Sequence, residues 1–88
     1  MATQLLAVGT NAASSDDVIV DEGSSITVAL KGASFSVRGV VKVELKDDAG
    51  GYWEIDRLNE YQPALVIVAP GTYRFSRVAG VSCGVFSA

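Results

Sequence analysis

The residues that could do chemistry in this chain are few, and histidine is absent. Without it there is no Ser–His or Cys–His nucleophile pair, no His-containing zinc site, and no imidazole general base. The single cysteine, Cys83, lies among small residues and has no neighbouring base to lower its pKa. We therefore predict a small buried packing residue at Cys83, with a reactive thiol as the alternative.

Carboxylates form three clusters: Asp16, Asp17, Asp21 and Glu22; Asp47 and Asp48; and Glu54, Asp56 and Glu60. A glycosidase needs two carboxylates across a cleft, one with a raised pKa. Glu54 and Asp56 instead lie two positions apart on the wet face of a predicted strand. Loop carboxylates at the first two clusters could bind calcium, but their spacing matches no EF-hand. Turn capping is the simpler interpretation, and no cofactor or metal is predicted.

The charge and the apolar runs exclude two classes of partner. The net charge is −3, and a nucleic-acid-binding domain needs a clustered basic face. No run reaches the 18–20 apolar residues of a membrane span. Residues 4–8 are too short an apolar run for a signal peptide, and one cysteine cannot form an internal disulfide. We expect cytosolic synthesis in reduced form, with neither nucleic acid nor a membrane as partner.

The elements that must position these residues have a period of two. Apolar and polar residues alternate in 25–31, 41–47 and 52–58, which is typical of strands with one buried face. The turn formers of 47–51 predict a hairpin with a five-residue loop between the last two strands. The alternation breaks at Arg57-Leu58, where we predict a bulge. Residues 32–36 are predicted to form a loop whose Phe35 covers the core.

A second hairpin is predicted over residues 63–78. Residues 63–69 are continuously apolar, which predicts burial on both faces. Pro70-Gly71 is typical of a type II turn, with Gly71 at positive φ. Residues 72–78 alternate again, with Tyr73 and Phe75 facing inward. A final short strand is predicted at 82–86.

The sequence thus predicts an all-β fold, a small antiparallel β-sandwich or barrel of about seven short strands. Residues 18–88 form the sandwich domain in this interpretation, and residues 1–17 an N-terminal arm and linker. Leu5, Leu6 and Val8 are apolar enough to need burial, and the connector after them has no large apolar residue. We predict that this arm binds a neighbouring molecule; a first strand folded onto its own sandwich is the alternative.

The aromatic and basic residues are assigned by the same alternation. Trp53 is predicted to face inward with Tyr73, whereas Tyr52 and Tyr61 are candidates for an outer binding surface. The basic residues of the strands are predicted to lie on a mixed, solvated face with the acidic ones: Lys42, Lys46, Arg74 and Arg77.

Four stretches together resemble the small β-sandwich structural proteins of tailed bacteriophages: residues 23–30, 41–46, 50–58 (with Gly-Tyr-Trp) and 69–75 (with Pro-Gly-Thr-Tyr-Arg). The resemblance covers residues 23–88 and leaves the first twenty-two uncovered. It implies a virion component, such as a capsid decoration or cement protein or a fibre domain. It also implies the major capsid protein or other virion proteins as partners, and it carries no catalytic residues.

The composition favours a role in binding. Hydrophobic residues make up 49% of the chain and the mean hydropathy is +0.31, so a domain of this size leaves apolar surface outside its core. We predict a non-enzymatic structural protein of a phage-type virion, made in the host cytoplasm, that forms a homo-oligomer. Its interface candidates are Leu5, Leu6, Val8, Tyr52 and Tyr61. The alternative function is a carbohydrate- or receptor-binding β-sandwich module.

Overall fold

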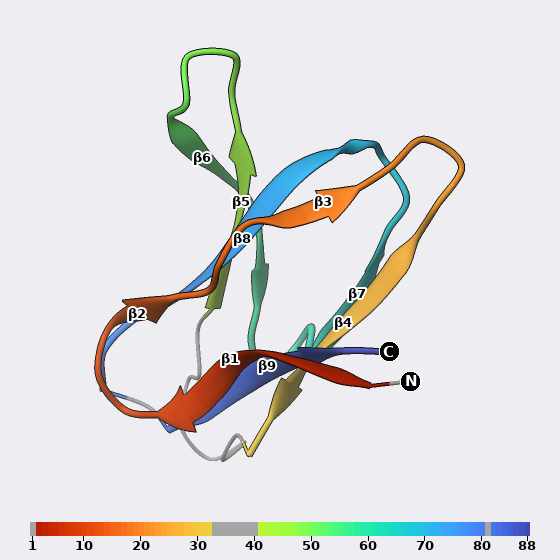
Figure 1. The fold of residues 1–88 in the computed structure, drawn as a ribbon. Helices are drawn as coiled ribbons and strands as arrows, with labels where there is room; N and C mark the ends of the chain where they lie inside the picture. The colour runs from red at the N-terminus through yellow and green to blue at the C-terminus, as the bar shows by residue number, and fades with distance from the viewer. Residues whose placement is uncertain (1, 33–40, 81) are drawn as a thin grey trace.

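A computed structural model describes residues 2–32, 41–80 and 82–88, and within them the chain forms two antiparallel sheets (Figure 1). Sheet A has the order β1 (Thr3–Gly9), β9 (Cys83–Ser87), β4 (Ile26–Lys31) and β7 (Ala64–Ile67). In sheet B, β8 (Gly71–Arg77) lies beside β5 (Val41–Lys46), which pairs with β6 (Tyr52–Leu58). The other side of β8 pairs with two short strands, β2 (Ala13–Ser14) and β3 (Val18–Val20). The predicted all-β sandwich is confirmed.

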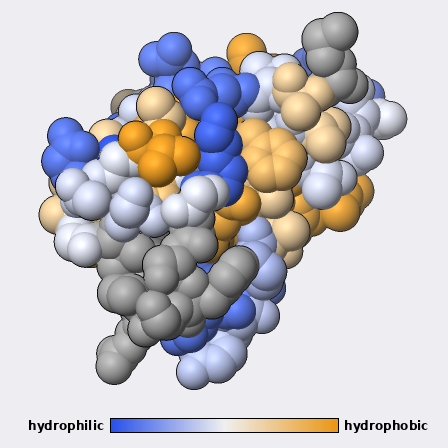
Figure 2. Space-filling model, turned by 90° about the horizontal axis from the view of Figure 1, so that it is seen from below, coloured by the Kyte–Doolittle hydropathy of each residue, from blue (hydrophilic) through white to orange (hydrophobic). Residues whose placement is uncertain are grey.

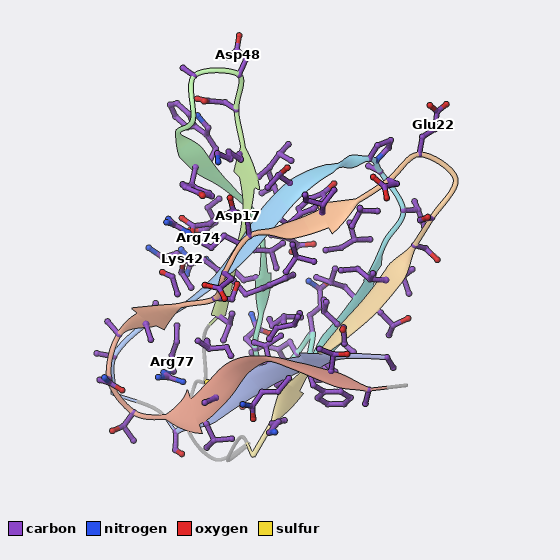
Figure 3. The ribbon with its side chains drawn as sticks, viewed as in Figure 1. Asp17, Glu22, Lys42, Asp48, Arg74 and Arg77 are labelled. Carbon is purple, nitrogen blue, oxygen red and sulfur yellow. The ribbon has the colours of Figure 1, made fainter. Side chains whose placement is uncertain are left out.

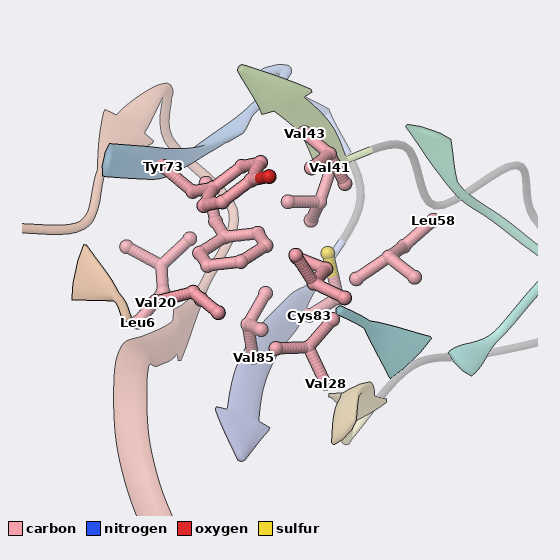
Figure 4. Close-up of a cluster of buried hydrophobic side chains, with 11 residues drawn as sticks. Leu6, Val20, Val28, Val41, Val43, Leu58, Tyr73, Cys83 and Val85 are labelled. Atoms are coloured by element: carbon pink, nitrogen blue, oxygen red, sulfur yellow. The ribbon is translucent and has the colours of Figure 1, made fainter. Parts of the chain in front are cut away.

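The core lies between the two sheets and is built by alternate residues of the central strands (Figure 4). Tyr73 and Phe75 of β8 are buried, as predicted. Cys83 is fully buried beside Val28 and Val85, which confirms its packing role. Burial also raises the pKa of the Cys83 thiol, although the charge of Arg77 opposes that effect.

The hairpin of β5 and β6 is confirmed, and it projects from the body of the sandwich (Figure 1). Its register shifts between Val43 and Glu44, opposite Asp56 and Glu54, which leaves Ile55 as the extra residue of a bulge. The bulge therefore precedes the predicted break at Arg57-Leu58. Beyond it Leu58 turns inward and is fully buried.

The second predicted hairpin is wrong. β7 pairs with β4 in sheet A and β8 pairs with β5 in sheet B, so the chain crosses between the sheets at 68–70. Gly71 opens β8 and is not among the glycines with positive φ, which excludes the predicted type II turn. β7 is an edge strand, so its continuous apolar sequence does not bring burial on both faces: Val66 is 59% exposed.

The predicted N-terminal arm is also corrected by the structure. β1 pairs antiparallel with β9 of the same chain, and Leu6 lies in the core. β2 and β3 continue from it onto β8, so the proposed boundary at residue 17 falls inside the sandwich. The prediction failed because the connector at 9–17 does pack on its own domain, through short strands rather than through large side chains. The predicted position of Phe35 lies outside the described residues.

Arg77 follows Tyr73 and Phe75 on the inward face of β8, so its predicted outward position is wrong, and it holds the N-terminal segment (Figure 3). Its guanidinium is buried and donates to the carbonyl oxygens of Ala7, Asn11 and Cys83, each at 2.7 Å. The guanidinium also donates, through Nη2, to the side-chain oxygen Oδ1 of Asn11 at 3.3 Å. One side chain of β8 therefore ties together β1, the connector to β2, and β9.

Candidate functional site

Exposed apolar side chains gather where the open edges of the two sheets meet. β6 is an edge of sheet B and β7 an edge of sheet A, and a groove of about 230 Å³ lies between them. Three exposed apolar residues line it: Ile55 (54%), Val66 (59%) and Val68 (66%). We call this surface the β6–β7 groove.

The floor of the groove is the core itself. Val43, Ile67 and Tyr73 line it although all three are buried, and the exposed Asp56 adds a carboxylate to its lining. The bulge at Ile55 explains why the sandwich stays open here, because it re-aims β6 just before the hairpin projects from the body. The Tyr73 hydroxyl does not add polarity, since it donates to the carbonyl oxygen of Ala69 at 2.8 Å.

The face seen from below relative to Figure 1 is mixed in character. Hydrophobic areas lie there on both sides of a hydrophilic band (Figure 2). Lys31 of β4 reaches across to the side chain of Gln4 of β1, with an Nζ–Oε1 distance of 2.7 Å.

The outer face of sheet B carries a polar cluster. Arg74 bonds Glu44 with an Nε–Oε1 distance of 3.0 Å, and its guanidinium lies 3.6 Å from the ring centroid of Tyr52. The Tyr52 hydroxyl in turn donates to Asp17 at 2.6 Å, and Lys46 pairs with the other oxygen of Asp17 at 3.2 Å. These contacts join β5, β6 and β8 to the segment before β3 (Figure 3).

The electrostatics of this polar cluster are those of paired charges. The hydrogen bond from Tyr52, and then that from Lys46, lowers the pKa of Asp17. Burial pushes the pKa of Glu44 upward, but hydrogen bonds from Ser76 and Arg74 outweigh it and the net shift is downward. Both carboxylates are thus held ionised and engaged by neighbours, so neither is set up as a general acid or base. A cavity of about 520 Å³ beside the cluster is lined by Lys42, Ser14 and Ser76 among others.

The structure does not bring the predicted interface residues together. Leu6 is buried and Leu5 packs partly against the core, so both belong to the chain's own sheet. Val8 is 45% exposed on β1, whereas Tyr61 is 88% exposed in the loop before β7, at the opposite edge of sheet A. Tyr52 is covered by Arg74 on one ring face.

Sequence reasoning missed all three exposed groove residues. Ile55 alternates in phase with Trp53, which predicts that it faces inward, and Val66 and Val68 belong to a continuous apolar run, which predicts burial. The signals that mark an edge strand were present in the sequence, since Pro63 and Pro70 flank the run and proline is confined to sheet edges and strand ends.

The predicted burial of Trp53 is wrong as well. Its side chain is 66% exposed, because β6 extends past the sandwich and sheet A does not cover that part of the hairpin. The indole N–H donates to Asp47 Oδ2 at 2.7 Å, and Asp47 Oδ1 accepts the backbone N–H groups of Ala49 and Gly51. The predicted turn-capping role of Asp47 is confirmed. Within the described ranges, no group of three or more Cys, Asp or Glu residues is arranged to hold a metal ion.

Asp47 gives the hairpin a defined acid sensitivity. The hydrogen bond from Trp53, and then those from Gly51 and Ala49, lowers the folded-state pKa of Asp47 below its ordinary value of 3.8. The ionised Asp47 carboxylate therefore stabilises the folded state fully above pH 3.8. This stabilisation is lost as the pH falls through the folded-state pKa of Asp47. We expect Asp47→Asn to lower the urea midpoint at neutral pH and to flatten its decline in acid.

The measurement is urea unfolding followed by circular dichroism between about pH 7 and pH 3. Asp48→Asn is the matched control, because it removes the adjacent carboxylate at the hairpin tip (Figure 3). An Asp47→Asn chain whose midpoint falls as steeply in acid as that of wild type would contradict the assignment.

Comparisons with known proteins assign this chain to no family. No protein-family model, curated protein or solved structure matches the chain. Among the described residues, no helix is long and apolar enough to cross a membrane. The fold defines a small antiparallel β-sandwich, and the open edges of its two sheets form the β6–β7 groove.

Proposed function

We propose that this chain is a non-enzymatic structural subunit that binds other proteins of a phage-type virion through the β6–β7 groove. The observation that carries the proposal is the convergence of Ile55, Val66 and Val68 on one groove with an apolar floor. Exposed apolar side chains scattered singly are ordinary, but a contiguous set around a concavity is typical of a binding surface.

The polar part of the molecule supports the same function. The carboxylates of the polar cluster are held in hydrogen bonds and ion pairs within the domain, and the cysteine is buried. The resemblance of residues 23–88 to phage structural proteins favours the capsid or a fibre as the binding partner. Because β1 is part of sheet A, the proposed contact is made by the sandwich itself and not by an N-terminal arm.

The carbohydrate- or receptor-binding alternative keeps one observation in its favour, which is the exposed indole of Trp53. An aromatic platform for a sugar needs an open ring face beside free polar groups. The nearest polar group, Asp47, is already used by the indole N–H and the turn, and one face of Tyr52 is covered by Arg74. The groove therefore supports the first function better.

The test is co-sedimentation of the purified chain with capsids or fibres of the virion whose genes neighbour its own. We expect the wild-type chain to pellet with the particles and Val68→Lys to stay in the supernatant, because burying a lysine ammonium at the apolar rim of the groove carries a desolvation penalty. Ile19→Lys is the matched control, since Ile19 is exposed to a similar extent (68% against 66%) but lies on β3.

Wild-type chain that stays in the supernatant would overturn the virion assignment. Equal losses for Val68→Lys and Ile19→Lys would overturn the role of the groove. Both variants change an exposed side chain, so native circular dichroism spectra are expected for both and should be recorded first.

A further inference from the structure

Edges of β-sheets invite pairing with other chains, and three of the four edges among the described strands are protected against it. β1 has register irregularities between Gln4 and Leu6 and again between Leu6 and Gly9. β6 has the bulge at Ile55 and exposed charged residues, Glu54, Asp56 and Arg57. The remaining edge of sheet B is divided into β2 and β3, with Asp16 and Asp17 between them.

The edge of β7 has none of these protections. Its register with β4 is regular over four consecutive pairs, from Ile26↔Ile67 to Ala29↔Ala64. Residues 64–68 read Ala-Leu-Val-Ile-Val and carry no charge. A regular, uncharged and apolar edge beside a largely apolar groove is the feature expected of a strand that is covered in the working state of the protein.

The hydrogen-bond pattern shows which backbone groups of β7 face outward. The N–H of Leu30 donates to the carbonyl of Pro63 at 2.8 Å, so these two residues form a hydrogen-bonded pair. Pair types alternate along an antiparallel ladder, which turns the backbone groups of Leu65 and Ile67 toward β4. The N–H and C=O groups of Ala64 and Val66 therefore point to the open edge.

We propose that the occupant of this edge is the β7 strand of a second copy of the chain, paired antiparallel about a two-fold axis at Val66. This inference rests on the proposed function, since pairing at the β7 edge brings the β6–β7 grooves of two copies together into one binding surface. In this register Val66 faces Val66 of the other copy, so its outward N–H and C=O groups bond those of its partner, and Ala64 lies opposite Val68, the residue that follows β7.

The absence of opposed charges favours a second copy as the occupant of the β7 edge. Self-pairing of β6 would set acidic residues of one copy near those of the other, and the edge of β2 and β3 has the same problem through Asp16 and Asp17. Self-pairing of β7 opposes no charges and pairs β-branched valines across the axis, which favours the sheet. With the axis perpendicular to sheet A, the inner faces of both copies continue into one another and the two grooves meet.

The experiment uses single cysteines as reporters of register. Under mild oxidation, Val66→Cys is expected to cross-link to itself, because directly opposite residues on antiparallel strands lie at Cα distances of about 4.5–5.5 Å, within disulfide range. Ala64→Cys alone and Val68→Cys alone are each expected to give no dimer, since like residues are offset by roughly 13 Å along the strands. A mixture of these two variants is expected to cross-link. The native Cys83 is fully buried, and wild type and Ile19→Cys supply the background.

Analytical ultracentrifugation supplies the second measurement. The wild-type chain is expected to sediment as a dimer of the 9.2 kDa chain, and Val66→Lys as a monomer with a native circular dichroism spectrum. A wild-type chain that remains monomeric up to about 1 mM, the weak end of specific affinities, overturns the inference. So does a dimer that survives Val66→Lys, or Ala64→Cys that cross-links to itself.

The two proposals can fail separately. A monomeric chain that binds virion particles and loses that binding in Val68→Lys would leave the proposed function standing and overturn the second copy as occupant. A dimer that forms the predicted cross-links but binds no virion particle would support the second copy as occupant and overturn the proposed function.

Discussion

Replacing Arg77 with methionine is expected to lower the free energy of unfolding by about 3–5 kcal/mol. The guanidinium is buried and bonds three backbone carbonyls, on Ala7, Asn11 and Cys83. Methionine fills similar volume but leaves these oxygens without their donor, and an unsatisfied buried acceptor costs more than the bond itself contributes. The total free energy of unfolding of a domain of this length is about 4–13 kcal/mol, so this loss removes a large part of its stability.

Urea unfolding followed by circular dichroism measures this loss, with Arg57→Met as the matched control. Arg57 is an exposed arginine whose side chain pairs only with Glu54 among the described residues, so its removal should leave the midpoint close to that of wild type. Arg77→Lys should fall between the two, because an ammonium group cannot reach three separated carbonyls at once. Equal midpoints for Arg77→Met and Arg57→Met would show that the N-terminal segment is held by other contacts.

Gly84→Ala is expected to cost about 2–3 kcal/mol by forcing β1 away from β9. A Cβ atom at Gly84 would lie 2.5 Å from the carbonyl oxygen of Leu6 and 2.9 Å from the backbone nitrogen of Val8. These neighbours are backbone atoms of a paired strand, so they cannot move aside as a flexible side chain would. The glycine is therefore required by the close approach of two strands rather than by its own φ.

Amide hydrogen exchange distinguishes this effect from general destabilisation. In Gly84→Ala we expect β1 and β9 to lose protection more than β5 and β8 do. Gly23→Ala is the control: Gly23 has φ of 83° with nothing within 4 Å of its Cβ position, so only left-handed strain of about 1 kcal/mol is expected. Uniform loss of protection in Gly84→Ala, or a cost no larger than that of Gly23→Ala, would contradict the prediction.

The sequence predicted the parts of the fold that are determined locally. Alternation placed Tyr73 and Phe75 in the core, and the turn formers at 47–51 placed the β5–β6 hairpin. Alternation tells which residues share a face of a strand, but it does not tell whether another sheet covers that face. Trp53 and Ile55 were misplaced for this reason, since β6 extends beyond the cover that sheet A provides.

The candidate site was beyond local reasoning because two strands from different sheets build it. The run at 63–69 is apolar whether it lies in the middle of a sheet or at its edge, and only the pairing of β7 with β4 decides between them. The role of Arg77 depends on carbonyls far away in the sequence, at Ala7 and Asn11. No pattern in the residues around Arg77 indicates those acceptors.

The pairing of β1 with β9 also sets the order in which the two sheets can fold. Thr3 pairs with Ser87 and Gly9 with Cys83, so the first strand has its partner only after the last one has left the ribosome. Until then Leu6 has no place in the core, and the edge of β4 that receives β9 is open. Closing contacts of such long sequence separation is slow. Assembly of sheet A is therefore a late step, and a nascent chain lacking β9 exposes β1 and β4 to other chains.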